Sequence, residues 1–170
     1  MKRILGVMIL VFVFVEMLTG CGLTVPKPEI KTGEFDFSVT YELNGETKTI
    51  SGVYVCEYNG TDWALDGGFH RDWKGYIKGG TEDTHIEIGT TEDGGTIFLC
   101  LRLYPDFLMG EDMNDIMDVS KPYLMIRYPE DELGGVNIIQ EADEIEATYG
   151  AKIIGYQYDE PIVNSFGLFK

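Results

Sequence analysis

A strict alternation of apolar and polar residues from Phe35 to Leu43 limits the fold of this chain more than any other feature. The apolar positions are Phe35, Phe37, Val39, Tyr41 and Leu43. A period of two predicts a β-strand with one dry face and one wet face. Asn44-Gly45 follows, a pair that tolerates the positive φ angles of a type I′ hairpin turn. A two-residue loop would pair Leu43 with Glu46, Val39 with Ile50, Phe37 with Gly52 and Phe35 with Tyr54.

A second Asn-Gly pair, Asn59-Gly60, predicts a second hairpin turn by the same reasoning. This turn would pair Cys56 with Trp63, Tyr54 with Leu65, Gly52 with Gly67 and Ile50 with Phe69. The two Gly residues would leave room for the Phe37 ring to lie across the sheet. We therefore expect a three-stranded meander over residues 35–69.

The rest of the chain is also rich in strand patterns. We expect a hairpin from strands 84–90 and 96–104 around Glu92-Asp93-Gly94-Gly95, lying centrally because its return strand is apolar on both faces. A helical turn or two, with Pro105 at a first helical position, suits 105–121. Strand 123–128 lies between prolines near an edge. Residues 138–149 fit a helix slightly better than a strand, with Gly150 as its stop, and strands 152–158 and 164–170 follow.

These patterns predict a mainly β protein: an antiparallel β-sandwich or open barrel of about eight or nine strands with one or two short helices. About 150 residues follow Cys21, which fits one domain with a single core, residues 34–170. Residues 22–33 are polar and contain Pro26 and Pro28, so we expect them to be a spacer that reaches up to about 40 Å.

The first residues have the composition of an export signal. Met1-Lys2-Arg3 is cationic, and the uncharged apolar run Ile4–Val15 follows it and ends before Glu16. A membrane-spanning helix needs about 20 apolar residues, so this run is too short to be a permanent anchor.

Leu18, Thr19, Gly20 and Cys21 resemble, position by position, the lipobox of bacterial lipoprotein precursors. The resemblance implies that residues 1–20 are a signal peptide that is cut off and that the Cys21 thiol carries lipid. It also implies that the mature protein is lipid-anchored on the extracytoplasmic face of a bacterial membrane. Glu16 departs from the family's pattern. From the residues alone, an uncleaved helix with an incidental Cys at its end is the alternative.

The charge balance argues against two classes of anionic partner. The chain has 13 basic and 29 acidic residues, and removal of Lys2, Arg3 and Glu16 leaves 11 and 28, a net charge of −17. Nucleic acids and anionic lipid headgroups need clustered Lys and Arg, so we expect neither as a partner. The acidity fits surface solubility, with cation binding in acidic loops as the alternative. Asp112, Asn114 and Asp118 resemble a calcium loop, but Met117 and Tyr123 occupy the positions where an EF-hand needs Gly and Glu.

Groups suited to catalysis are scarce. The four serines lie outside any Gly-x-Ser-x-Gly motif, and His70 and His85 are the two histidines. Cys56 and Cys100 fit buried free thiols better than a disulfide or a Cys-His pair. Paired carboxylates cannot be singled out among so many acids. We expect no metal site and no cofactor.

An aromatic cluster offers the candidate binding site. Trp63, Phe69, Trp73 and Tyr76 lie close to Arg71 and Asp72. The period-two pattern places Trp63 and Phe69 on the dry face and leaves Trp73 without a core position, so Trp73, Tyr76, Arg71 and Asp72 could stack against and hydrogen-bond a ligand. Burial of Trp73 at the core edge is the alternative.

Three functions remain open from the sequence. The first is a non-enzymatic surface lipoprotein that binds an extracellular glycan, a small ligand or an envelope protein. The second is a carboxylate-dependent enzyme acting on envelope polymers. The third is an accessory subunit without its own ligand. The membrane itself is the expected partner of the lipid on Cys21.

Overall fold

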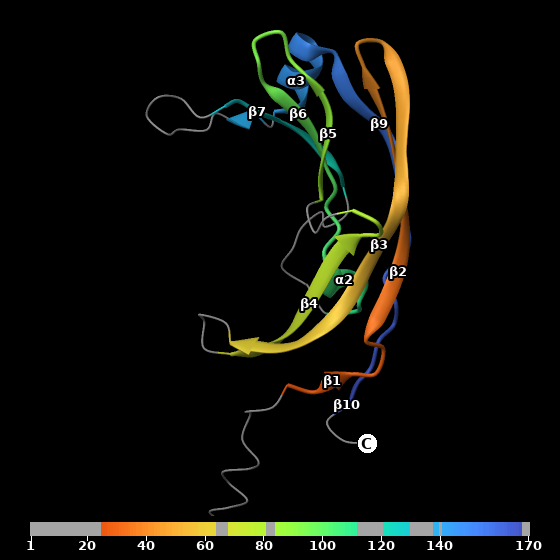
Figure 1. Ribbon diagram of the computed structural model, residues 1–170. Coiled ribbons are helices and arrows are strands. Elements are labelled where there is room, and N and C mark those ends of the chain that lie inside the picture. The colour runs from red at the N-terminus through yellow and green to blue at the C-terminus, as the bar shows by residue number, and fades with distance from the viewer. Residues whose placement is uncertain are drawn as a thin grey trace, which may run out of the picture.

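A computed structural model describes residues 25–63, 68–80, 84–111, 121–129, 138–139 and 141–167. The described residues form a β-sandwich of antiparallel sheets, as predicted (Figure 1). One sheet has the order β4-β3-β2-β9, the other β5-β6-β7-β8, and β1 pairs with β10. The strands are β1 Lys27–Pro28, β2 Thr32–Leu43, β3 Glu46–Trp63, β4 Phe69–Ile77, β5 His85–Thr90, β6 Thr96–Cys100, β7 Tyr123–Arg127, β8 Ile138–Ile139, β9 Ala151–Tyr158 and β10 Phe166–Gly167, and the helices are α2 Pro105–Leu108 and α3 Ala142–Tyr149.

The first hairpin has the predicted register. Val39 faces Ile50, Phe37 faces Gly52 and Phe35 faces Tyr54. Asn44 and Gly45 have φ angles of 54° and 79°, as a type I′ turn requires. A Cβ atom at Gly52 would lie 3.0 Å from Cζ of Phe37, so the ring does lie over this glycine.

The second predicted turn is wrong. β3 continues through Asn59-Gly60 as far as Trp63, and β4 pairs with it so that Tyr54 faces Ile77 and Tyr58 faces Trp73. Gly60 has a φ of 126°, and the register shifts between Tyr58 and Gly60 as in a β-bulge. An Asn-Gly pair suits a bulge as well as a turn, because both need unusual φ angles. Leu65 and Gly67, two partners in the predicted register, lie outside the described residues.

The second sheet follows the sequence pattern more closely. β5 and β6 form the predicted hairpin around residues 92–95, and β6 lies between β5 and β7. Leu101 and Leu103 are buried although they follow the end of β6. β7 was predicted near an edge, but it also pairs with β8, which is two residues long.

α3 lies between the two sheets, against β7 and β9, and α2 packs against β3 and β4 (Figure 1). Pro105 occupies the first turn of α2, as predicted. The helix expected within 138–149 is present from Ala142, and Gly150 ends it in the left-handed conformation. Ile145 of α3 is fully buried with Val39, Leu99 and Ile126, so helix and sheets share one core. Cys56 and Cys100 are buried free thiols, as expected.

The N-terminal segment joins the domain earlier than predicted. Lys27–Pro28 pairs with Phe166–Gly167, and Thr32 and Gly33 already belong to β2. The polar composition suggested a free spacer, yet strand pairing uses backbone groups that every sequence carries. Of the expected strand 164–170, Phe166–Gly167 forms β10, and residues 168–170 lie outside the described part. The signal peptide, Cys21 and residues 22–24 also lie outside it.

Candidate functional site

β4 carries the four residues predicted to bind a ligand, but it does not bring them together. Because side chains alternate along a strand, Arg71 and Trp73 lie on one face of β4 and Asp72 and Tyr76 on the other. Trp73 belongs to the core and is 6% exposed. The expectation of a displayed Trp73 is therefore wrong. Its burial follows from the β3–β4 register, which places it opposite Tyr58, with ring centroids 5.4 Å apart.

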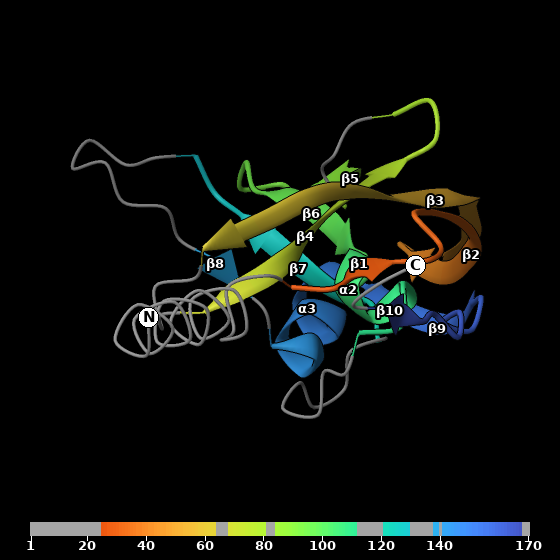
Figure 2. The same cartoon turned by 90° about the horizontal axis from the view of Figure 1, so that it is seen from below.

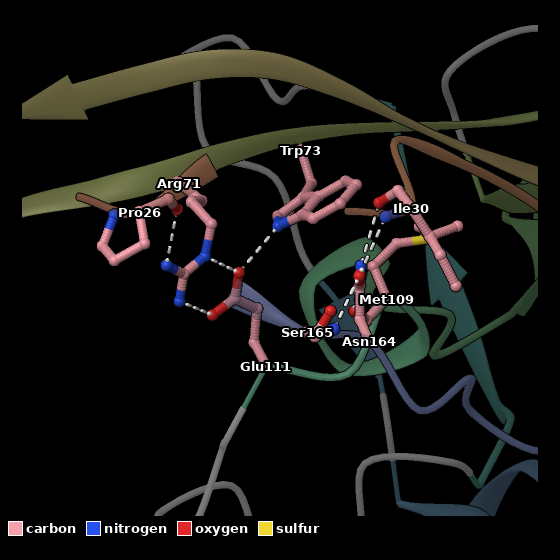
Figure 3. Close-up of polar contacts among 8 residues, drawn as sticks. All are labelled: Pro26, Ile30, Arg71, Trp73, Met109, Glu111, Asn164 and Ser165. Carbon is pink, nitrogen blue, oxygen red and sulfur yellow. Dashed lines mark hydrogen bonds and ion pairs between the residues drawn. The ribbon is translucent and has the colours of Figure 1, made fainter. Parts of the chain in front are cut away.

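Arg71 and Trp73 belong to one polar network at the end of the sandwich where β1 and β10 lie (Figure 3). Nε and Nη2 of Arg71 both donate to the Glu111 carboxylate, and Nε1 of Trp73 donates to Oε1 of Glu111 at 3.0 Å. Nη1 of Arg71 donates to the Pro26 carbonyl oxygen at 3.1 Å. The Arg71 and Glu111 side chains are each 16% exposed. The network therefore fixes both Pro26 of the N-terminal segment and Glu111 to β4.

The charges in this network stabilise one another. Burial acts to raise the pKa of Glu111, but the hydrogen bonds from Arg71 and Trp73 and the nearby guanidinium outweigh it and lower that pKa. The hydrogen bond to Glu111 raises the pKa of Arg71. Both groups are thus charged and already paired, which indicates a structural role.

Asn164 forms a second fastening at the same end of the molecule (Figure 3). Its Nδ2 donates to the carbonyl oxygens of Ile30, at 2.9 Å, and Met109, at 3.2 Å. Its Oδ1 accepts the N–H groups of Ile30 and Ser165. We call the end that contains β1, β10, the Arg71 network and Asn164 the base of the sandwich. Four segments far apart in the sequence are joined there, around residues 26–30, 71–73, 109–111 and 164–167.

Asp72 and Tyr76 make separate contacts on the outer face of β4. The Asn59 side-chain amide donates to Asp72, which ties the bulge of β3 to β4. The Tyr76 hydroxyl donates to Oε1 of Glu57 at 3.0 Å. The four predicted residues therefore belong to three unconnected sets of contacts.

A hollow of about 610 Å³ lies at the other end of the sandwich. Three turns form its wall: the β2–β3 turn, the β5–β6 turn and the end of α3. It is lined by Leu43, Asn44, Thr90, Thr91, Glu92, Asp93, Ile97, Thr148, Tyr149 and Gly150. The backbone N–H of Asn44 donates to the Gly150 carbonyl oxygen at 3.1 Å, which fixes two of the turns to each other. We call this site the end hollow. Its volume is typical of small-ligand pockets.

A chain of hydrogen bonds supports the wall of the end hollow. The Tyr128 hydroxyl donates to Oδ2 of Asp93 at 3.0 Å and lies 2.6 Å from the Tyr149 hydroxyl. Because the Tyr128 proton is directed to Asp93, Tyr149 is the donor to Tyr128. Hydrogen bonds from Thr91 and from Tyr128 lower the pKa of Asp93 against a smaller effect of burial. Asp93 is thus an ionised acceptor held in place.

A second, smaller hollow of about 440 Å³ lies on the β2–β3–β9 sheet. It is lined by Asp36, Phe37, Ser38, Ser51, Gly52, Val53, Gln157 and Asp159. Oδ2 of Asp159 accepts the Asp36 backbone N–H at 2.8 Å, so one of its two carboxylates already has a structural partner. We call it the outer hollow.

The sequence also raised two alternatives, a reactive cysteine and a metal site in an acidic loop. Burial raises the pKa of the Cys56 thiol to about 12, so this thiol does not ionise at neutral pH and is a poor nucleophile. No group of three or more His, Cys, Asp or Glu residues that could hold a metal occurs in the part of the chain that the structure describes. Asp112, Asn114 and Asp118 lie outside that part.

Sequence reasoning did not find the end hollow. In the sequence, the parts of its wall are two separate turns, at Asn44 and at Asp93, and a helix stop at Gly150. Turns far apart in the sequence converge only when the sheets pack together.

Comparisons of the chain with protein-family models, with curated proteins and with solved structures found no match.

Proposed function

We propose that this chain is a lipid-anchored extracytoplasmic protein whose β-sandwich binds a neutral, polyhydroxylated small ligand, such as a short glycan, in the end hollow. The lipobox at Leu18–Cys21 supports the anchor. Among the described residues, no helix is long and apolar enough to span a membrane.

The observation that carries this proposal is the position of the end hollow relative to the N-terminal segment. That segment is fastened at the base, whereas the end hollow lies beyond the far end of β2 (Figure 1). β2 has 12 residues, which span about 36 Å at the rise of a β-strand. A lipid on Cys21 would therefore hold the base near the membrane and present the end hollow to the aqueous side.

The chemistry of the lining selects the class of ligand. Glu92 and Asp93 are carboxylates, and the lining contains no Lys or Arg, so an anionic ligand would be repelled. The C-terminus of α3 adds partial negative charge. The Thr and Tyr hydroxyls and the Asn44 amide can each donate and accept hydrogen bonds, which suits sugar hydroxyl groups. The half-buried Tyr149 ring offers an apolar surface.

The carboxylate-dependent enzyme is the second candidate. Among the described acids, Asp106 of α2 has a pKa that is raised, because its carboxyl group is partly buried. A raised pKa is one property of a general acid. Neither hollow is lined by Asp106, so binding fits the geometry better than hydrolysis.

The anchor is tested by replacing Cys21 with Ser. We expect this variant to lose all labelling by a radioactive fatty acid and to accumulate as the unprocessed precursor, because a hydroxyl cannot replace the thiol that takes the lipid. Cys56→Ala is the matched control and should label and mature normally. Normal maturation of Cys21→Ser would contradict the proposal.

The end hollow is tested by titrating the protein with neutral oligosaccharides in an NMR or calorimetric screen. For a ligand found there, we expect Asp93→Asn to weaken binding about tenfold or more, because a hydrogen bond to a charged group contributes about 1.5–3 kcal/mol. Asp159→Asn, in the outer hollow, should leave the Kd unchanged. The opposite pattern would move the site to the outer hollow, and preferential binding of anionic ligands would refute the proposed ligand class.

A further inference from the structure

Trp63 and Phe69 form an exposed aromatic pair where the β3–β4 ladder ends. They face each other in register, with ring centroids 4.8 Å apart and an interplanar angle of 83°. Trp63 is 54% exposed and Phe69 39%. The sequence pattern predicted both on the dry face, and this prediction is wrong because β3 continues past the bulge and beyond the core. Large aromatic side chains left exposed together indicate a contact surface.

The aromatic pair lies next to the place where the N-terminal segment is fastened. Phe69 and Arg71 are on the same strand, about 7 Å apart at the rise of a β-strand. Arg71 holds the Pro26 carbonyl oxygen at 3.1 Å. In Figure 2, seen from below, β1 and the end of the β3–β4 hairpin both lie toward the viewer, at the base.

The length of chain between Cys21 and Pro26 limits how far the base can stand from a membrane. A fully extended chain covers at most about 3.3–3.6 Å per residue, so five residues reach about 17 Å. A freely mobile spacer over residues 22–33 would reach more than twice as far. The Arg71 network holds Pro26 against β4, so the free part of the spacer is only the stretch between Cys21 and Pro26. A lipid on Cys21 therefore keeps the base within reach of the lipid headgroups.

We propose that Trp63 and Phe69 insert into the headgroup layer of the membrane that holds the lipid on Cys21, and that this second contact fixes the orientation of the domain. The inference rests on the lipid anchor proposed above. Trp is enriched at membrane interfaces because its ring is apolar and its N–H is polar. The acidic chain is poorly suited to electrostatic contact with anionic lipids, so the two aromatic rings make the contact. A membrane of zwitterionic lipid is enough for this contact to form.

The chain contains two tryptophans, which makes the proposal directly measurable. Trp73 is buried, so the difference between wild-type protein and Trp63→Phe reports on Trp63. The full lipidated protein is placed in phosphatidylcholine vesicles that contain a lipid with a nitroxide on its headgroup. We expect the nitroxide to quench the Trp63 emission and aqueous iodide to quench it several-fold less than in the unlipidated chain that lacks residues 1–21, measured in solution. Trp63→Phe should show neither change, while its unchanged Trp73 emission confirms folding.

Three outcomes would overturn the proposal. If Trp63 is as accessible to iodide on vesicles as in solution while Cys21 is fully lipidated, the membrane contact is refuted and the anchor stands. If Trp63 of the chain that lacks residues 1–21 is already shielded in solution in a concentration-dependent way, a second copy of the chain covers the pair. If mass spectrometry finds no lipid on Cys21, the anchor and the membrane contact both fail.

Discussion

Replacing Val39 with Asp is expected to unfold the domain. Val39 is fully buried at the centre of the shared core, between Ile50 of β3 and Tyr156 of β9. The substitution removes about 1.5–3 kcal/mol of apolar burial. It also buries a carboxylate without a partner, which costs several kcal/mol more. The total approaches the whole stability of a small domain, about 5–15 kcal/mol. Urea denaturation followed by circular dichroism measures the change.

Thr40→Asp, one residue along the same strand, is the matched control. Thr40 lies on the opposite face of β2, where its hydroxyl is 3.1 Å from the Thr49 hydroxyl. Loss of that hydrogen bond should cost about 1 kcal/mol. Equal destabilisation by the two substitutions would mean that the two faces of β2 are assigned wrongly.

Replacing Trp73 with Ala is expected to lower the free energy of unfolding by about 3–5 kcal/mol, the usual cost of removing a large buried aromatic side chain. The Trp73 ring packs edge-on against Tyr58, and its Nε1 donates to Glu111. The substitution therefore leaves a cavity and also removes one donor from a largely buried carboxylate. Chemical unfolding measures the loss, and a change within about 1 kcal/mol, typical of an exposed residue, would contradict the burial of Trp73.

Trp73→Phe separates the two parts of this effect, since it keeps most of the ring and removes the N–H group. We expect a smaller loss, about 1.5–3 kcal/mol from the hydrogen bond to a charged group. The pKa of Glu111 is lowered in the folded protein, so its stabilising contribution is present above its ordinary pKa and is lost as the pH falls through the folded-state value. The difference between wild type and Trp73→Phe should therefore shrink in acid.

The regular elements were largely predictable from local patterns. The alternation of Phe35–Leu43 and the pair Asn44-Gly45 specify a hairpin whose register has no competitor, because a shift by one residue would expose the apolar face. The stop at Gly150 is equally local, since a left-handed residue ends the helix. Each of these signals lies within a few residues of the structure that it predicts.

The candidate sites were not predictable in the same way. Arg71, Asp72, Trp73 and Tyr76 are neighbours in sequence, and neighbours on a strand point to opposite faces. Asn44, Asp93 and Tyr149 are far apart in sequence and line one hollow. Closeness along the chain was therefore a poor guide to closeness in space.

The sequence by itself determined the β class, the first hairpin and its register, the β5–β6 hairpin and the stop at Gly150, whereas the pattern of residues 138–149 fits both helix and strand, and these residues form β8 and α3. The tertiary structure alone decided whether Asn59-Gly60 is a turn or a bulge, whether residues 26–33 are a spacer or part of the domain, and which tryptophan is buried. Gly60 has a positive φ in the bulge, and a type I′ turn would also require one there, so the Asn-Gly pair alone does not choose between the two. The choice depends on burial of Trp73 against Tyr58 and on hydrogen bonds from Arg71 to Pro26 and Glu111, and these free energies arise between residues that only the folded chain brings together.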